Sequence, residues 1–240
     1  MGPIPSGDGR KRYFSDLYIP SYTPTLSALI GSRISGKQAF ERPSILLVTQ
    51  PDQSLNTASQ ESRAIQQLDT KVTTLMSNEA TPSNVVARLR EHRFSHFVCH
   101  GKLEDGKPFD ASFKLHDGTH LTLLDLIRSQ LPSAEFAFLS ASHTAEITEG
   151  SLADESLHLT AAMQFCGFRS VVGTMWGMAD VDGPELAAHF YKSMFSGNKG
   201  SDVPYYERSA EALRDAVQML RRKNKGLPLE RRVNFVHYGA

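Results

Sequence analysis

The sequence predicts an α/β domain, with one mostly parallel sheet and helices on both of its faces. Short apolar runs bounded by proline, glycine or polar residues alternate with longer segments of helical periodicity. Strands and helices that alternate in this way form parallel sheets covered on both sides. The run SILLVT at residues 44–49 also lacks polar alternation, which is typical of a strand buried on both faces.

The remaining elements follow from the same reading, taken along the chain. Thr81 before Pro82, and Thr122 three residues before Asp125, have the pattern of helix starts. A short hairpin is expected between residues 112–115 and Leu121, within an otherwise mobile segment after Gly101. Further strands are expected at residues 71–75, 94–99, 135–140, 169–175 and, at an edge, 232–238. Helices are expected at residues 25–30, 58–68 (with Glu61 and Arg63 outward), 83–92, 123–131, 155–165, 185–195 and 207–222.

Composition excludes several classes of protein. With 40% hydrophobic residues in 240 the chain can bury a large core, and its 26 basic and 26 acidic residues favour neither nucleic acid nor membrane. No apolar run is long enough to span a bilayer. Cys99 and Cys166 lie in apolar stretches, which predicts free thiols and a cytoplasmic, reducing compartment. Residues 1–12 are expected to be a disordered arm or an expression remnant, and residues 13–240 the folded domain, with the aromatic residues of 13–30 packed onto it.

Candidate catalytic groups follow two of the expected strands. The strand at 94–99 stops at His100-Gly101, and the strand at 135–140 is followed closely by Ser142. Because ligands bind at the carboxyl ends of parallel strands, a base and a hydroxyl are expected at one crevice. The N–H groups of Gly101 and Ser142 would then form an oxyanion site. The alternative, in which His100 and Ser142 are ordinary loop residues, stays open on spacing alone.

Neighbouring polar residues have simpler interpretations. His96 lies inside a strand and should point away from the crevice, and Cys99 should face the side of the sheet opposite to His100. No carboxylate that would orient His100 is evident. Asp154 and Glu155 are first-turn helix acids, or else face a basic substrate side chain. No spacing typical of metal ligands and no glycine-rich phosphate loop occurs, so neither a metal nor another cofactor is predicted.

Several ordered blocks of sequence carry a family resemblance. They are His100-Gly101 after an apolar strand, LSA-x-x-TA at 139–145, DESLHL at 154–159, GFRSVVGTMW at 167–176 with Asp180, Phe190-Tyr191, FVHYG at 235–239 and YTPTLS at 22–27. Together, over roughly residues 22–239, these blocks resemble the CHAT family. CHAT domains are cysteine peptidase modules related to caspases and separases, and they often follow tetratricopeptide repeats.

The resemblance implies a caspase-like three-layer sandwich that cleaves a protein or peptide and follows an upstream repeat or sensor domain. It implies that His100 is the catalytic histidine and that Ser142 occupies the position of the nucleophilic cysteine. Serine there is an engineered inactivating substitution, a natural degenerate site or a working nucleophile. Two functions therefore remain: a peptidase module that is inactive as written, and a non-catalytic peptide-binding scaffold or decoy.

Overall fold

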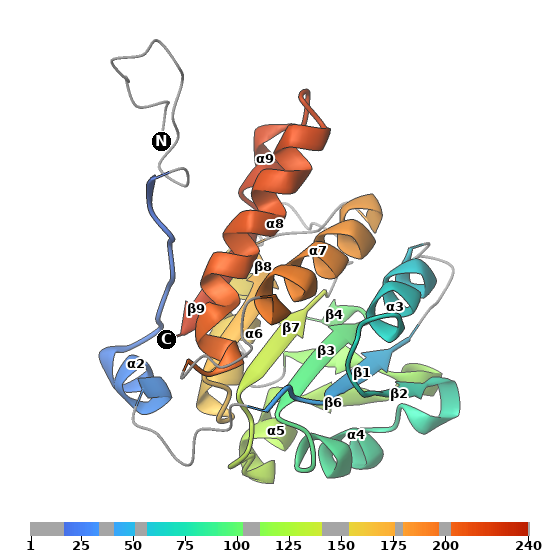
Figure 1. Ribbon diagram of the computed structural model, residues 1–240. Helices are drawn as coiled ribbons and strands as arrows, with labels where there is room; N and C mark the ends of the chain where they lie inside the picture. The colour runs from blue at the N-terminus through green and yellow to red at the C-terminus, as the bar shows by residue number, and fades with distance from the viewer. Residues whose placement is uncertain are drawn as a thin grey trace.

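A six-stranded sheet forms the centre of the computed structural model, which describes residues 17–33, 41–50, 57–102, 111–140, 154–175, 180–196 and 203–239 (Figure 1). Its strand order is β2-β1-β3-β7-β8-β9, and all neighbours are parallel except β8 and β9. The predicted mostly parallel sheet is therefore confirmed. The strands are β1 (Ile45–Thr49), β2 (Val72–Met76), β3 (Phe94–Val98), β7 (Phe136–Leu139), β8 (Ser170–Thr174) and β9 (Phe235–Gly239).

Helices cover both faces of this sheet and make the molecule three layers deep (Figure 1). One face packs on α4 (Pro82–Leu89), α5 (Leu123–Ser129) and α6 (Asp154–Phe165). The other face packs on α3 (Ala58–Gln66), α7 (Gly183–Phe195) and α8 (Ser209–Lys223). Burial of side chains on both faces explains why β1 and β7 are almost entirely apolar. No helix in the described part of the chain is long and apolar enough to cross a membrane.

Local sequence signals account for several helix ends. The Thr81 side chain accepts a hydrogen bond from the N–H of Asn84, at the start of α4. Thr122 and Asp125 form the predicted capping box at the start of α5, where each side chain bonds the backbone N–H of the other. The predicted start of the last strand was wrong: residues 229–232 form the short helix α9 (Leu229–Arg232), so this strand begins three residues later than expected.

The segment after Gly101 contains more regular structure than the sequence predicted. Its described residues form an antiparallel sheet of β4 (Gly101–Lys102), β5 (Ser112–Lys114) and β6 (His120–Thr122). The predicted hairpin is confirmed. Its ordering has a clear cause, because Phe113 and Leu121 are fully buried and the Phe113 ring stacks on Phe97 of β3 with centroids 4.5 Å apart.

The aromatic residues before α2 (Leu26–Arg33) pack less closely than expected. Tyr22 bonds through its backbone to β9, donating to the carbonyl of His237 and accepting from the N–H of Gly239. Its side chain is nevertheless 50% exposed, and that of Tyr18 is 57% exposed. The segment therefore packs onto the domain as expected, through main-chain pairing with β9 and a contact between the Tyr22 and Tyr238 rings, whose centroids lie 5.7 Å apart, but Tyr18 and Tyr22 are only about half-buried.

Candidate active site

His100 is the second residue after β3 and directly precedes β4, and it is almost completely buried. Its carbonyl oxygen accepts a hydrogen bond of 2.8 Å from the N–H of Lys114 in β5. In an antiparallel ladder, this bond makes Gly101 and Phe113 a non-hydrogen-bonded pair, so the N–H of Gly101 points away from β5. The small sheet thus fixes the backbone at the predicted base and directly after it.

The strands that lead to His100 and Ser142 are direct neighbours. Phe94 pairs with Phe136, and every further pair of β3 and β7 keeps the same offset of 42 positions. The N–H of Ser140 extends the ladder past the end of β7 by donating to the carbonyl of Phe97 at 2.9 Å. His100 and Ser142 differ by the same 42 positions in the sequence. Ser142 itself lies outside the described residues.

The predicted substrate-binding acids lie at the start of α6. The helix begins at Asp154, with Glu155 as its second residue. Both acids therefore occupy the first turn, as expected from the sequence. The positions of their side chains are outside the described part of the structure.

A buried carboxylate, which the sequence reading placed at the surface, lies beneath the ends of β3 and β7. Glu61 of α3 is only 2% exposed, so its predicted outward orientation was wrong. One carboxylate oxygen lies 3.0 Å from Nε2 of His96, and the other accepts a hydrogen bond of 2.9 Å from the Ser140 hydroxyl. The same carboxylate thus contacts both strands that lead to the candidate site.

His96 points away from the strand ends and into a helix interface, as predicted. Its Nδ1 lies 3.0 Å from the hydroxyl of Tyr191 in α7. Burial and the nearby carboxylate of Glu61 raise the pKa of Tyr191 well above its ordinary value, so its hydroxyl stays protonated. No acid beside His100 is evident in the sequence. The contact of Glu61 with a different histidine, His96, was not predicted.

A signal for Glu61 was present in the helical spacing of α3. The buried residues of this helix follow one another at intervals of three, one and three, which is the face of a helix that packs against a sheet. Glu61 falls on this face between apolar neighbours. The position of Glu61 in the helix therefore predicts a buried side chain, and a buried carboxylate requires a hydrogen-bonding partner. The residues on this face are Ala58, Glu61, Ser62 and Ile65.

Neither cysteine has the environment of a nucleophile. Cys99 is fully buried in the core cluster formed with α4, α5 and α6, and burial raises the pKa of its thiol to about 12. Cys166, at the end of α6, is 4% exposed, and burial raises its pKa to about 12 as well. The predicted role of both as buried hydrophobic residues is confirmed.

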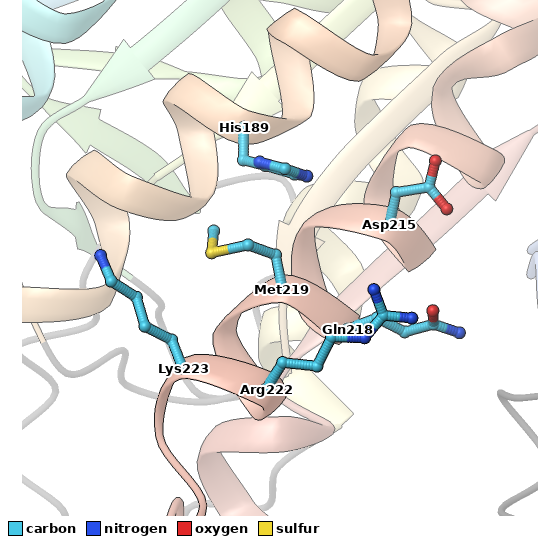
Figure 2. A pocket seen from close by; sticks show the side chains of 6 residues that line it. All are labelled: His189, Asp215, Gln218, Met219, Arg222 and Lys223. Atoms are coloured by element: carbon cyan, nitrogen blue, oxygen red, sulfur yellow. The ribbon is translucent and has the colours of Figure 1, made fainter.

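A surface hollow of about 640 Å³ lies elsewhere, between α7 and α8. Figure 2 shows His189 of α7 and Met219 of α8 lining it, with Arg222 and Lys223 at one end. None of the described side chains that line it comes from β3 or β7. Within the described ranges, no group of three His, Cys, Asp or Glu side chains could hold a metal ion.

Comparison with solved structures supports the same fold. The Arg-specific cysteine proteinase gingipain R matches with a TM-score of 0.54 and 9% identity, over 82% of this chain and 46% of that chain. The complex of the Porphyromonas gingivalis RgpB pro- and mature domains matches with a TM-score of 0.55 and 8% identity, over 82% and 47%. Separase in the Saccharomyces cerevisiae separase–securin complex matches with a TM-score of 0.55 and 14% identity, over 91% and 13%.

The chain therefore spans less than half of the length of each of these proteins, and the TM-scores show a shared caspase-like fold. A search of curated proteins finds no match by sequence. The family model described as "CHAT domain" matches residues 3–232, which is nearly the whole chain. The chain therefore belongs to the CHAT domain family.

Proposed function

We propose that this chain is a peptidase module in which His100 is the general base and residue 142 the nucleophile, and that serine at position 142 leaves it without efficient cleavage. The observation that carries the proposal is the register of β3 and β7. Their common offset of 42 positions is also the separation of His100 from Ser142. If the pairing continues past both strands, the two residues lie side by side at the carboxyl edge of the sheet, where α/β proteins bind ligands.

The backbone supplies a second part of the proposed site. The N–H of Gly101 points away from β5, and the Lys114 bond to the His100 carbonyl holds the chain at that point. The N–H groups of Gly101 and residue 142 would together stabilise the oxyanion that forms when a peptide carbonyl is attacked. This contribution depends on the chain path and is independent of the side chain at position 142.

Serine weakens the chemistry for a specific reason. A thiol beside an imidazole loses its proton readily and attacks as a thiolate, whereas a hydroxyl must be deprotonated as it attacks and needs a well-oriented base. The buried carboxylate of Glu61 bonds His96 of β3 and the Ser140 hydroxyl. We therefore propose a module that keeps its peptide-binding crevice, so a scaffold or decoy role is the second candidate function.

We further propose that the module follows an upstream repeat or sensor domain that controls access to a protein substrate in the cytoplasm. CHAT modules often follow tetratricopeptide repeats, and the family match supports this arrangement. Separase, which shares the fold, is solved in a complex with securin.

Restoring the thiol tests the dyad directly. Ser142→Cys should react with iodoacetamide at neutral pH faster than Cys99 or Cys166, because imidazolium lowers the pKa of a neighbouring thiol below its free value of about 8.5. Mass spectrometry after a brief treatment would locate the label. Label on residue 142 that is no faster than on the native cysteines, or that is unchanged by His100→Ala, would exclude the dyad and leave the scaffold function.

Asp154 and Glu155 are proposed to favour a basic residue before the scissile bond. Both acids lie in the first turn of the helix that follows residue 142 along the chain. In the Ser142→Cys background, Asp154→Asn with Glu155→Gln should lower cleavage of peptides with arginine or lysine at that position, and should leave peptides with neutral residues unaffected. Equal processing of both libraries would show that these acids serve only the helix.

A further inference from the structure

The contacts of Glu61 join the two strands that lead to the proposed dyad. Its carboxylate lies 3.0 Å from Nε2 of His96 in β3 and 2.9 Å from the hydroxyl of Ser140 at the end of β7. The exposed fractions of these three residues are all 2% or less. No solvent competes for these bonds, and a low local dielectric strengthens them.

The donors and acceptors of Glu61, His96 and Ser140 are compatible with a single arrangement of their hydrogen bonds. A carboxylate only accepts, so Nε2 of His96 donates to Glu61, and the Ser140 hydroxyl donates to its second oxygen. Nδ1 of His96 is bonded to the Tyr191 hydroxyl, and the imidazole stacks on Phe138. Four elements, α3, β3, β7 and α7, therefore meet at one fully bonded buried network.

Stability alone is a poor explanation for such a network. Burying a carboxylate is unfavourable unless its hydrogen bonds compensate, and apolar residues of similar size often stabilise a core equally well. The network instead fixes β3 and β7 relative to each other, because moving either strand would break a hydrogen bond to the buried carboxylate of Glu61. Ser140 is two residues from position 142, and two residues of chain reach at most about 7 Å. The place of Ser140 thus restricts that of the nucleophile.

We propose that Glu61 and Ser140 are positioning residues, which hold the end of β7 against β3 so that residue 142 meets His100. The inference rests on the proposed function. Neither residue touches the substrate in this scheme, and both act through the chain that follows Ser140.

The chain offers a matched control on the same helix. The hydroxyl of Ser62, next to Glu61 in α3, donates a buried hydrogen bond of 2.9 Å to Thr49 at the end of β1. Ser62→Ala and Ser140→Ala thus each remove one hydroxyl and one buried contact with α3. Only Ser140→Ala loosens a strand that leads to the dyad.

The experiment measures the iodoacetamide labelling rate of residue 142 against pH, in the Ser142→Cys background. Small displacements at a reacting centre are costly, so Ser140→Ala should slow labelling about tenfold and shift the midpoint of the pH profile toward that of a free thiol. Ser62→Ala should change the rate less than about twofold and leave the midpoint in place. Circular dichroism and thermal melts would show that both variants are folded.

The possible outcomes separate the two claims. If His100→Ala slows labelling but Ser140→Ala has no larger effect than Ser62→Ala, the positioning role is wrong and the dyad stands. If His100→Ala has no effect, there is no dyad to position, and both claims fall. A loss of rate in Ser140→Ala with an unshifted pH midpoint would also overturn the inference, because it would show general loosening without displacement from His100.

Discussion

The imidazole of His96 stacks on the ring of Phe138, with ring centroids 4.7 Å apart and planes inclined by 13°. These residues are direct partners across β3 and β7. The histidine therefore serves the core as a flat ring in contact with a neighbouring ring, while its two nitrogens bond Glu61 and Tyr191. It combines the packing of an aromatic residue with the donor that a buried carboxylate requires.

Removing this donor should be strongly destabilising. His96→Phe keeps a ring against Phe138 but leaves Glu61 without its partner in β3, and breaking a buried pair in this way costs about 3–5 kcal/mol. Urea denaturation would measure the free energy of unfolding. The double variant with Glu61→Leu should recover part of the loss, because the unpaired charge is gone.

His116, whose side chain is 30% exposed, provides the control for histidine loss. His116→Ala should change stability by no more than about 0.5 kcal/mol. A cost below about 1 kcal/mol for His96→Phe would show that Glu61 finds another partner or reaches water.

Stability should fall in mild acid because of His237 in β9. Burial lowers the pKa of this imidazole to about 4 from an ordinary value of 6.5. The folded state therefore binds fewer protons than the unfolded state between these values. This contribution to stability is complete above pH 6.5 and is lost as the pH falls toward 4, by about 1.4 kcal/mol per pH unit.

Comparison with His237→Gln would isolate this effect from other titrating groups. Glutamine cannot take up a proton, so the free energy of unfolding of the variant should depend less steeply on pH between 6.5 and 4. The variant also loses contacts with Ser21 and Ser209, which lowers its stability at every pH without changing this slope. Parallel curves for the two proteins would mean that His237 is protonated in the fold.

A side chain at Gly173 should not fit between β8 and α6. A Cβ atom there would lie 2.2 Å from Oγ1 of Thr160, whose side chain is short, β-branched and buried. Gly173→Ala should therefore destabilise by about 1–3 kcal/mol, as overpacked cores do. Thermal melts would measure the effect.

The companion substitution Thr160→Ala removes the clashing atom. The double variant should be more stable than the sum of the two single losses predicts, which is a favourable coupling between contacting sites. Additive losses would show that the strand moves away from α6 and that the side chain of Thr160 is not the obstacle.

The sequence was sufficient for elements whose signals are local. Continuous apolar runs identified the buried strands, and the Thr122–Asp125 spacing identified a helix start that the structure confirms. These features depend on residues within a few positions of each other, so no knowledge of the fold is needed to find them.

Features that depend on distant contacts were missed. Glu61 was predicted to face solvent because it is charged, although the spacing of its helix places it on the buried face. Its partners His96 and Ser140 are 35 and 79 positions away in the sequence. The predicted start of the last strand at residue 232 was wrong for a similar reason. An alternating pattern does not show where pairing with β8 begins, and Phe235 is the first residue that pairs.

The two native cysteines should be unreactive in the folded protein. Burial raises the pKa of both thiols from 9.0 to about 12, which lowers the thiolate fraction near neutral pH by about a thousandfold. Ellman's reagent should find both thiols in denaturant and neither, on a timescale of minutes, in buffer. Cys166 lies at the end of α6 and is slightly exposed, so it should react first if local opening occurs. Fast reaction of Cys99 would instead mean that the centre of the sheet opens, because that residue is enclosed by the core beneath α4 and α5.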